Sequence, residues 1–362
     1  MNTAAWRTEI APRLEALARS LETAGADALL VTKPANVRYL SRFSAPDDGA
    51  VLVVPGVGAT LLTDSRYAAQ AADEVGIPVE IVAGIDDAVV ARLAGGRGRL
   101  AVEGDHVTVS RYRSLAERLG HEPALLGPVF SELRVIKSES ELAALRRAAH
   151  LTDLAFTAAT EVMAPGVSEV TVALVLERTM RQHGADGPAF STIVASGVRG
   201  AMPHGVASNK PLAAGELVTL DFGAVVDGYH ADMTRTVAIG QVGAEERRLY
   251  DAVLEAQEAA LGAVAPGRTG REVDQVARDV LAKHGLEQQF THSLGHGTGL
   301  VIHEEPRLSQ KSDTVLRPGM VVTVEPGVYR AGFTGLRIED LVVVTESGSE
   351  VLSKSPKAFL AL

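Results

Sequence analysis

The chain has 362 residues, of which 46% are hydrophobic and 22% are charged, and this composition is typical of a folded globular protein with two domains. Its 35 basic and 45 acidic residues give a net charge of −10, which argues against a partner that is nucleic acid or an anionic membrane surface. The chain contains no cysteine, which excludes disulfides, thiolate metal sites and a cysteine nucleophile. No apolar run approaches the roughly 18 residues of a membrane-spanning helix. Because Glu9 and Arg13 also interrupt the N-terminal segment, we expect a cytoplasmic protein.

Helical and strand-like patterns alternate through the first 133 residues. Residues 4–23 carry apolar side chains at helical spacing, which predicts an amphipathic helix. A short apolar strand is expected over 27–32, and further strand-like and helix-like runs alternate after it. This alternation predicts an α/β domain over residues 1–133. The glycine-rich stretch 95–98 precedes a strand instead of following one, so we expect a loop there and not a dinucleotide-binding turn.

The pattern changes near residue 134. A long helical segment follows Ser138, and Glu141 lies three residues after that serine, the spacing of a capping box. We therefore place the start of a second domain at residue 134 and expect it to cover 134–362.

The second domain contains a weak internal repeat. Residues 164–177 resemble 265–281, because each begins with a Pro-Gly turn that leads into a helix. Residues 214–223 match 318–327 at an offset of 104 positions, which superposes Asp221 on Glu325. A duplicated α+β unit would relate the two halves by a pseudo-twofold axis and would bring their acidic residues together.

Four acidic residues occupy matching places in the two halves. Each lies at or near a strand-like run, and a single carboxylate at such a place usually faces solvent. Four carboxylates in one cleft, however, would repel one another severely without cations. Two divalent metal ions would balance four negative charges. The sequence therefore predicts a dinuclear metal site that includes Asp221, Asp232, Glu325 and Glu339.

Histidines are concentrated in one segment of the chain. Residues 284–303 contain four of the ten histidines, namely His284, His292, His296 and His303. His296 lies between glycines, which makes a helix improbable there and presents the imidazole from an extended backbone. An imidazole beside carboxylates favours Mn, Co, Zn or Fe over Ca or Mg. We expect His284 to end a helix, and His204 taken alone is expected to be a loop residue.

This order of acidic residues and histidine resembles the five-ligand dinuclear site of the pita-bread metallopeptidases, which include methionine aminopeptidase, aminopeptidase P and prolidase. The similarity extends through LDFGAVVDGYHADMTRTV, HSLGHGTGLVIHE, VVTVEPGVY and GLRIEDLVVV and covers residues 138–362. The segment TDSRYAAQA resembles the N-terminal domain of small bacterial Xaa-Pro peptidases. The resemblance implies a creatinase-like α/β N-terminal domain and a pita-bread α+β catalytic domain with a pseudo-twofold repeat.

The resemblance also implies a role for each site residue. Two divalent ions, Mn, Zn or Co, would be held by Asp221, Asp232, His296, Glu325 and Glu339, with Asp232 and Glu339 bridging. Glu325 would also accept a proton from the attacking hydroxide. His292 and His303 would donate hydrogen bonds to the substrate carbonyl and stabilise the tetrahedral intermediate. His204 would contact the peptide. Arg337, which we expect two residues before Glu339 on the same face of one strand, would orient the ligand carboxylates.

The length of the substrate stays open at this level. The overall resemblance favours aminopeptidase P, a metal-dependent exopeptidase that hydrolyses the N-terminal Xaa-Pro bond of peptides. The alternative is an Xaa-Pro dipeptidase (prolidase), and a remote alternative is a non-catalytic scaffold protein. A dipeptidase needs a group that binds the substrate carboxylate, for which Arg38, Arg42 and Arg199 are candidates, and residues 36–48 could form a loop that limits the cleft. The expected partners are a proline-containing peptide and a second copy of the chain, in a homodimer whose N-terminal domain closes over the partner's cleft.

Overall fold

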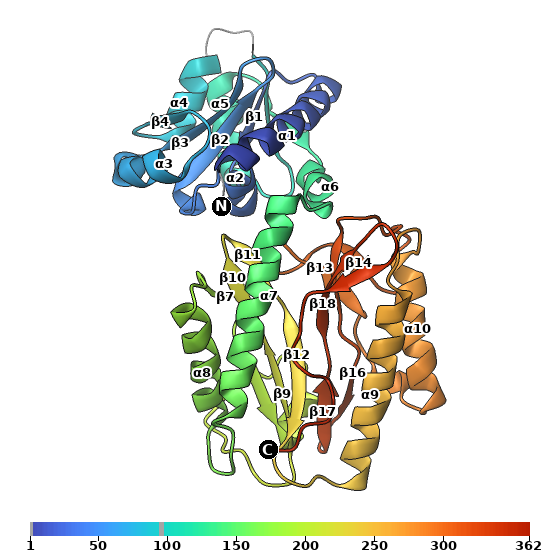
Figure 1. Cartoon of the computed structure of the whole chain (residues 1–362). Coiled ribbons are helices and arrows are strands. Elements are labelled where there is room, and N and C mark those ends of the chain that lie inside the picture. The colour runs from blue at the N-terminus through green and yellow to red at the C-terminus, as the bar shows by residue number, and fades with distance from the viewer. Residues whose placement is uncertain (1–2, 94–97) are drawn as a thin grey trace. The chain divides into compact units, whose positions relative to one another are not determined.

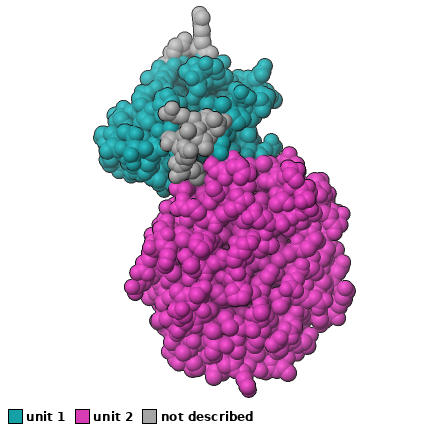
Figure 2. Space-filling model, in the orientation of Figure 1, with its two compact units in different colours: residues 1–134 teal, residues 135–362 magenta. Residues whose placement is uncertain are grey.

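The computed structural model describes residues 3–93 and 98–362 (Figure 1). The chain divides into two compact units, Met1–Arg134 (unit 1) and Val135–Leu362 (unit 2), which Figure 2 shows in different colours. The boundary between the units falls one residue after the expected domain boundary. Apart from Gly98, the expected loop at 95–98 lies outside the described residues. Among the described residues, no helix is both long enough and apolar enough to cross a membrane.

Unit 1 is built on one mixed six-stranded sheet in the order β4-β3-β2-β1-β5-β6. Its central strand, β1, runs parallel to β5 and antiparallel to β2. All four residues of β1 are buried, as expected for a strand that is covered on both faces. The strands are β1 (Ala28–Val31), β2 (Gly49–Val54), β3 (Gly58–Thr63), β4 (Val79–Ile81), β5 (Leu100–Glu103) and β6 (Ala124–Leu126).

The helices of unit 1 alternate with these strands along the chain. They are α1 (Thr3–Ala24), α2 (Pro34–Ser41), α3 (Ala68–Glu74), α4 (Ile85–Leu93), α5 (Val109–Leu119) and α6 (Val129–Val135). Val89 of α4 and Leu115 of α5 are fully buried and belong to a core cluster that includes Leu30 and Leu52 of the sheet. The predicted first helix and first strand are thus confirmed as α1 and β1.

Unit 2 begins with the long helix α7 (Glu139–Thr160), and its start confirms the predicted capping box. The Ser138 hydroxyl accepts the backbone N–H of Glu141, while the Glu141 carboxylate accepts the backbone N–H of Ser138. These two bonds satisfy N–H groups that have no partner inside the helix, and they fix where the helix begins.

The predicted repeat corresponds to two halves of similar construction. Helix α7 packs against α8 in the first half and α9 against α10 in the second, with the strands between the two helix pairs (Figure 1). Strand β9 pairs antiparallel with β12 in the first half, as β15 pairs with β18 in the second. The helices are α8 (Glu169–Gln182), α9 (Ala244–Ala263) and α10 (Gly270–Lys283). The strands are β7 (Gly187–Pro188), β8 (Ile193–Ser196), β9 (Leu217–Phe222), β10 (Ala224–Val226), β11 (Tyr229–His230), β12 (Met233–Ala238), β13 (Gly295–Gly297), β14 (Glu304–Leu308), β15 (Val321–Val324), β16 (Gly327–Arg330), β17 (Thr334–Arg337), β18 (Asp340–Val344) and β19 (Ser349–Val351).

One expectation about the strands is wrong. The run that contains Arg337 and Glu339 is not a single strand, because β17 ends at Arg337 and β18 begins at Asp340 in a different sheet. Arg337 pairs with Gly327 in a hairpin, whereas Asp340 pairs with Val324. The backbone N–H of Glu339, between the two strands, donates to the carbonyl of Thr234 at 3.0 Å. Glu339 therefore lies where the two halves of unit 2 meet.

Candidate active site

A cavity of about 580 Å³ in unit 2 contains the whole predicted site. Its lining includes all nine residues that were expected to bind metal or to take part in catalysis, namely His204, Asp221, Asp232, His292, His296, His303, Glu325, Arg337 and Glu339. Asp221 belongs to β9 and His296 to β13, whereas Glu325 directly follows β15. The cavity thus receives acidic side chains from both halves, as the repeat predicts.

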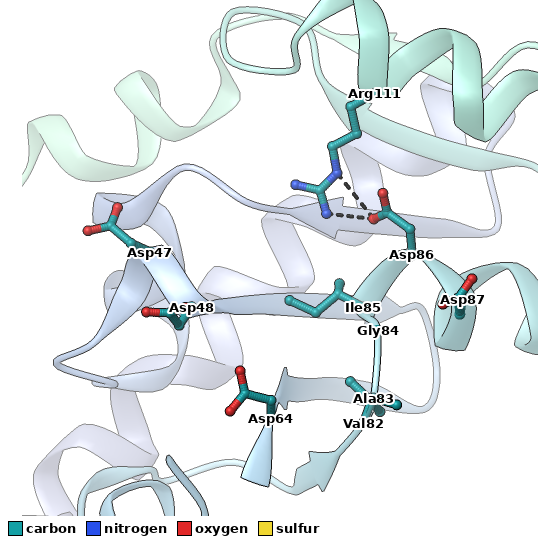
Figure 3. Close-up of a pocket in the computed structure, with 10 residues that line it drawn as sticks. All are labelled: Asp47, Asp48, Asp64, Val82, Ala83, Gly84, Ile85, Asp86, Asp87 and Arg111. Atoms are coloured by element: carbon teal, nitrogen blue, oxygen red, sulfur yellow. Dashed lines mark hydrogen bonds and ion pairs between the residues drawn. The ribbon is translucent and has the colours of Figure 1, made fainter. Parts of the chain in front are cut away.

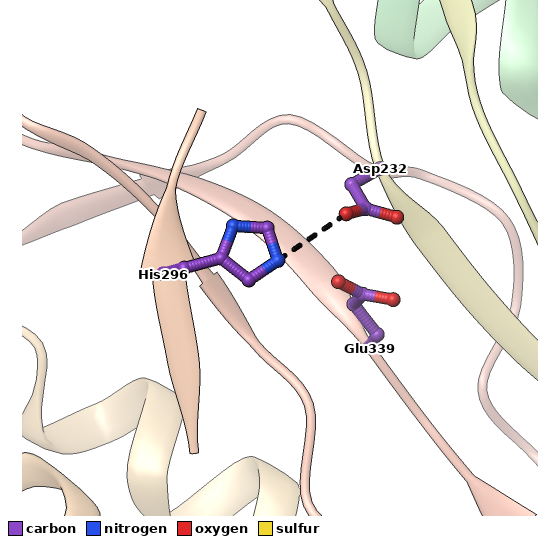
Figure 4. A group of neighbouring side chains, drawn as sticks. All are labelled: Asp232, His296 and Glu339. Atoms are coloured by element: carbon purple, nitrogen blue, oxygen red, sulfur yellow. Dashed lines mark ion pairs between the residues drawn. The ribbon is translucent and has the colours of Figure 1, made fainter. Parts of the chain in front are cut away.

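Three of the five predicted ligands form the tightest cluster (Figure 4). Asp232, His296 and Glu339 offer ligand atoms that all lie within 4.8 Å of one another. The Nε2 atom of His296 lies 3.5 Å from Asp232 Oδ2 and 3.4 Å from Glu325 Oε1. Asp221 is not part of this group, and its Oδ2 accepts a hydrogen bond from Arg337.

The hydrogen bonds of His296 fix which ring nitrogen faces the carboxylates. Its Nδ1 lies 3.0 Å from the carbonyl oxygen of Gly297, which can only accept, so Nδ1 carries the proton. Burial lowers the pKa of His296 to about 3, and the ring is therefore neutral at pH 7. Its Nε2 then directs a lone pair toward the carboxylate oxygens, an arrangement that is repulsive unless a cation lies between these groups.

The pKa values of the carboxylates also indicate that a cation belongs between these groups. Burial raises the pKa of Asp232 well above its ordinary value, and the nearby carboxylates, Glu339 first, raise it further. Burial likewise raises the pKa of Glu339, with Glu325 and Asp221 adding to the effect. Burial also raises the pKa of Glu325 to about 7, although Arg337 opposes this shift. Each raised pKa shows that the charged form of the carboxylate is destabilised by burial and by the neighbouring negative charges.

Two buried oxygen atoms support a cation directly. Among the described residues, Asp221 Oδ1 and Glu339 Oε1 are buried carboxylate oxygens without a hydrogen-bond partner. Buried polar atoms are normally satisfied, and an ion is one of the partners that explain such exceptions. Four carboxylates and one imidazole are a donor set that suits Mn, Zn or Co. The residues present therefore fit divalent metal ions.

Arg337 links these carboxylates to the rest of the cavity wall. Its Nε donates to the Thr234 hydroxyl at 3.0 Å, and that hydroxyl donates to Glu339 Oε2 at 2.6 Å. Its Nη1 donates to the Tyr329 hydroxyl at 2.7 Å. One buried guanidinium thus orients Asp221, Glu339 and Tyr329 together, which fits the orienting role predicted for Arg337.

The structure changes the expectation for His292. Its Nδ1 lies 2.8 Å from the carbonyl oxygen of Ser293 and its Nε2 lies 3.0 Å from the Tyr329 hydroxyl. The Nδ1–H of His292 therefore donates a hydrogen bond to the Ser293 carbonyl, and Nε2 accepts one from the Tyr329 hydroxyl. Burial lowers the pKa of His292 to about 4, so the ring carries no second proton at pH 7. In this arrangement His292 has no N–H left for a substrate carbonyl, and its direct contact is with Tyr329.

His303 and His204 differ from His292 because both are exposed in the cavity wall. The His303 ring lies edge-on to the ring of His296, with centroids 4.4 Å apart. Burial lowers the pKa of His303. A neutral imidazole next to the ligand cluster can donate one hydrogen bond toward the cavity.

Four contributors to the site were missed by sequence reasoning. Thr323 accepts the backbone N–H of His296 at 3.0 Å and donates to Glu325 Oε1 at 3.0 Å. The repeat and the strand pattern could have found Thr323 and Thr234, since each lies two positions from a predicted ligand. Tyr329 and Arg307 give no such signal, because only the folded chain shows that Arg307 lines the cavity and that Tyr329 contacts His292 and Arg337.

A second cavity, of about 390 Å³, lies in unit 1 and is lined by five aspartates (Figure 3). Sequence reasoning expected no such grouping. Most of its charge is balanced, because Asp86 pairs with Arg111, Asp87 with Arg118, and Asp48 and Asp64 both pair with Arg66. These pairs explain the cluster as a network of ion pairs.

Comparison with known proteins gives two matches that together cover most of the chain. Residues 143–346 match the family described as "Metallopeptidase family M24", and residues 13–136 match "Creatinase/Prolidase N-terminal domain". The order of the two matches confirms the predicted fold class, a creatinase-like N-terminal domain followed by a pita-bread catalytic domain.

Three similar proteins illustrate the match. The structure of an Xaa-Pro dipeptidase from Bacillus anthracis is 42% identical, has a TM-score of 0.93 and aligns with 98% of this chain and 100% of its own. An Xaa-Pro dipeptidase of Pyrococcus furiosus is 39% identical over 96% of this chain and 99% of its own length. The structure of an X-Pro aminopeptidase from Thermotoga maritima is 36% identical, has a TM-score of 0.88 and aligns with 95% of this chain and 100% of its own.

Proposed function

The chain belongs to metallopeptidase family M24 and is a hydrolase, and from this premise we propose that it hydrolyses Xaa-Pro dipeptides with the help of two divalent metal ions. This proposal replaces the preference for aminopeptidase P that the sequence suggested. Relatives named as dipeptidases outnumber the aminopeptidases among the similar proteins, and they support the shorter substrate.

The position of Arg307 in the cavity is the observation that favours a dipeptide over a longer peptide as the substrate. It belongs to β14 and is the register partner of His296 on β13. It lines the cavity, and no ion pair joins its guanidinium to a carboxylate of the described residues. A dipeptide has a free carboxylate close to its scissile bond, and an arginine binds a carboxylate through two parallel hydrogen bonds. We therefore assign the substrate carboxylate to Arg307.

Arg199, a candidate for the same task in the sequence, is already engaged. Its Nε lies 2.9 Å from a carboxylate oxygen of Glu169, which is fully buried. Arg38 and Arg42 belong to unit 1 and do not line the cavity. Arg307 is therefore the arginine we would test first.

The metal ions would be held by the five predicted ligands, with Asp232 and Glu339 as the shared carboxylates. Divalent ions at such a site act as Lewis acids and make water nucleophilic near pH 7. Mn, Zn and Co all suit the donor set, so we propose one of these three.

Glu325 would move the proton in this reaction. Its Oε1 accepts from Thr323 at 3.0 Å and faces His296, and its Oε2 carries no hydrogen bond of comparable length. The raised pKa of about 7 allows this carboxylate to take a proton from the attacking water and to give it to the leaving nitrogen. His303 would donate to the carbonyl oxygen as negative charge develops there.

The remaining wall of the cavity suits a proline ring. The scissile bond of Xaa-Pro is a tertiary amide, so a site that depends on its N–H cannot bind it. Apolar side chains supply the alternative recognition by packing, and the lining includes Phe190, Ile193, Val206 and Ile302. His204, which also lines the cavity, would contact the peptide.

The direct test compares an Xaa-Pro dipeptide with the matching Xaa-Pro-Xaa tripeptide, each with Mn, Zn or Co. We expect the dipeptide to be the better substrate and Arg307→Met to raise its KM by about 10-fold to 100-fold, the range of a charged hydrogen bond. Arg317→Met, which removes an exposed arginine outside the cavity, is the control. If the tripeptide is hydrolysed faster than the dipeptide and Arg307→Met does not affect this, the aminopeptidase P interpretation would be supported instead.

We further propose a homodimer in which the N-terminal domain closes over the cleft of the partner. The support is the same family resemblance, together with the absence of a metal-type cluster among the described residues of unit 1. Light scattering on the full chain and on a variant without residues 1–133 tests it, alongside kinetics on both peptides. A folded variant that keeps its dimer and its preference for length would contradict the proposal. The cytoplasmic location expected from the sequence stays a prediction.

A further inference from the structure

The segment that carries His204 into the cavity is a loop over residues 197–207, which opens with a short 3-10 helix, Gly197–Ala201. It begins after strand β8, which ends at Ser196, and it ends before Ser208. The His204 side chain is exposed and makes no hydrogen bond or ion pair to another described residue. The position of this imidazole is therefore set by the backbone of the loop and not by contacts of the ring.

One carboxylate holds both ends of this loop. Glu169 lies in the first turn of α8 and has no exposed surface. Its Oε1 accepts the backbone N–H and the hydroxyl of Ser196, both at 2.8 Å. Its Oε2 accepts the backbone N–H of Ser208 at 3.1 Å and the hydroxyl of Ser208 at 2.6 Å. Both oxygens of one buried anion thus join residues twelve positions apart in the chain.

Arg199 connects Glu169 to the interior of the loop. Its Nε donates to Glu169 Oε2 at 2.9 Å, and its Nη2 donates to the carbonyl of Val206 at 2.6 Å. The guanidinium therefore connects the buried carboxylate to a residue two positions from His204. Charged hydrogen bonds of this kind are stronger than neutral ones, and the burial of the Glu169 carboxylate strengthens the bond from Arg199 Nε further.

The opposite side of the loop rests on the site. The carbonyl of Pro203 accepts a hydrogen bond from Arg337 Nη1 at 3.3 Å. Gly200 packs directly on β17, where a Cβ atom at Gly200 would lie 2.6 Å from the carbonyl oxygen of Gly335. The loop is thus fixed between Glu169 on one side and the site strand on the other.

The second half of unit 2 uses the same construction on its equivalent helix. Asp274 of α10 is fully buried, accepts the backbone N–H of Leu294 at 3.0 Å and pairs with Arg278 at 2.7 Å. Arg278 in turn donates to the carbonyl of His292 at 2.7 Å. In both halves, a buried carboxylate on the helix after the Pro-Gly turn pairs with an arginine and holds a segment that bears a cavity histidine.

From these contacts we infer that Glu169, acting with Arg199, is the positioning residue for His204. The inference rests on the proposed function, because it assigns to His204 a contact with the peptide substrate. Glutamine cannot replace this glutamate. Donors surround both carboxylate oxygens, so the NH₂ group of glutamine would face donors at one of the two ends of the loop. Glu169→Gln should free one end of the loop and misplace the imidazole.

A double-mutant cycle on a dipeptide substrate tests the inference. We expect Glu169→Gln to lower kcat/KM about 10-fold, mainly through KM, and to have less than a 2-fold effect when His204→Ala is already present. Glu169→Asp keeps the charge and should recover part of the loss. Bound metal, measured by elemental analysis, should equal that of the unaltered protein in every variant. Independent, additive effects of the two substitutions would overturn the inference.

Hydrogen exchange provides a readout that does not depend on activity. Backbone N–H groups over residues 197–207 should exchange faster in Glu169→Gln than in the unaltered protein. The control is Ser168→Ala, which removes the cap of the same helix but no contact of Glu169, and it should leave the loop and KM unchanged. If Glu169→Gln does not fold, Ser208→Ala removes only the 2.6 Å bond and should give a smaller effect of the same kind. If the unaltered protein hydrolyses no dipeptide, the proposed function fails. If exchange in the loop is the same in Glu169→Gln as in the unaltered protein, this inference fails, whatever the activity.

Discussion

Replacing Arg235 with methionine removes a buried cation that lies behind the site. The Arg235 side chain is 2% exposed and donates to the carbonyls of Thr234, Glu339 and Ser355 as well as to Asp340. Asp340 is fully buried and has two further partners, the Lys357 ammonium and the Gln257 amide. Methionine has a similar volume but offers no donor, so the carbonyls of Glu339 and Ser355 lose their donor and the Asp340 carboxylate loses its closest arginine.

The size of the effect follows from these losses. Removing one partner of a buried ion pair costs about 3–5 kcal/mol when the other charge is left unpaired. Asp340 keeps its pair with Lys357 at 2.6 Å, but the buried carbonyls of Glu339 and Ser355 lose their donor at about 1–3 kcal/mol each, which brings the expected loss into the same range. Unit 2 spans Val135–Leu362, and for a unit of this size each kcal/mol shifts the Tm by roughly 2–4 °C. The expected fall in Tm is therefore about 6–20 °C. Because Arg235 also holds the backbone at Glu339, the affinity for metal should fall too.

Calorimetry and urea unfolding measure the stability, and titration with Mn²⁺ measures the affinity. Arg247→Met is the matched control, since Arg247 forms a surface pair with Asp251 in which both side chains are 53% exposed. Such a pair contributes about 0–1 kcal/mol. Adding Asp340→Asn to Arg235→Met should cost less than the sum of the two single changes. A loss below about 1 kcal/mol for Arg235→Met would refute the reasoning, because it would mean that the buried pair is not holding this part of unit 2.

Three further predictions concern the site and the surface of unit 2. Asp232→Asn should lose both metal and activity, and full activity in a metal-free Asp232→Asn protein would contradict the dinuclear site. His296→Ala should lose metal, whereas His303→Ala should keep it and lose about 100-fold to 1,000-fold in kcat, the range for one oxyanion donor; loss of both ions from His303→Ala would reverse these two assignments. The hydrogen bond from Arg248 is the main cause that lowers the pKa of Glu245 from its ordinary 4.5 to about 2, so this carboxylate stabilises the fold above pH 4.5 and the contribution is lost as the pH falls toward 2. Unfolding of Glu245→Gln and the unaltered protein should therefore differ at pH 7 and converge near pH 2, with a smaller difference at high salt.

The sequence carried enough information to select the site because the acidic residues repeat. Asp221 and Glu325 superpose at a fixed offset, and two similar strands must present them to one cleft. The local pattern also placed His296 on an extended backbone, whereas its role as a metal ligand came from the resemblance to the pita-bread metallopeptidases. Each of these features lies within a short segment that can be interpreted alone or matched to its repeat, so the periodicity of strands and the fixed offset are sufficient to interpret them.

The partners of the site residues could not be predicted in the same way. The bond from Arg337 to Asp221 joins residues 116 positions apart, and the bond from Thr234 to Glu339 joins residues 105 apart. Which side chains meet across such distances depends on how the two sheets come together, and no local pattern encodes that. The role expected for His292 changed for this reason, since only the folded chain shows that Tyr329 occupies its Nε2.

The contact between Gly200 and Gly335 has a consequence for how this sequence can vary. Each residue approaches the backbone of the other, and a Cβ on Gly335 would lie 2.3 Å from the carbonyl oxygen of Gly200. When two large side chains collide, replacing one with a smaller residue can make room for the other. Both residues here are already glycine, so no second substitution at the contact can compensate for the first. The two positions are therefore constrained as a pair, and drift at either one removes the support of the His204 loop.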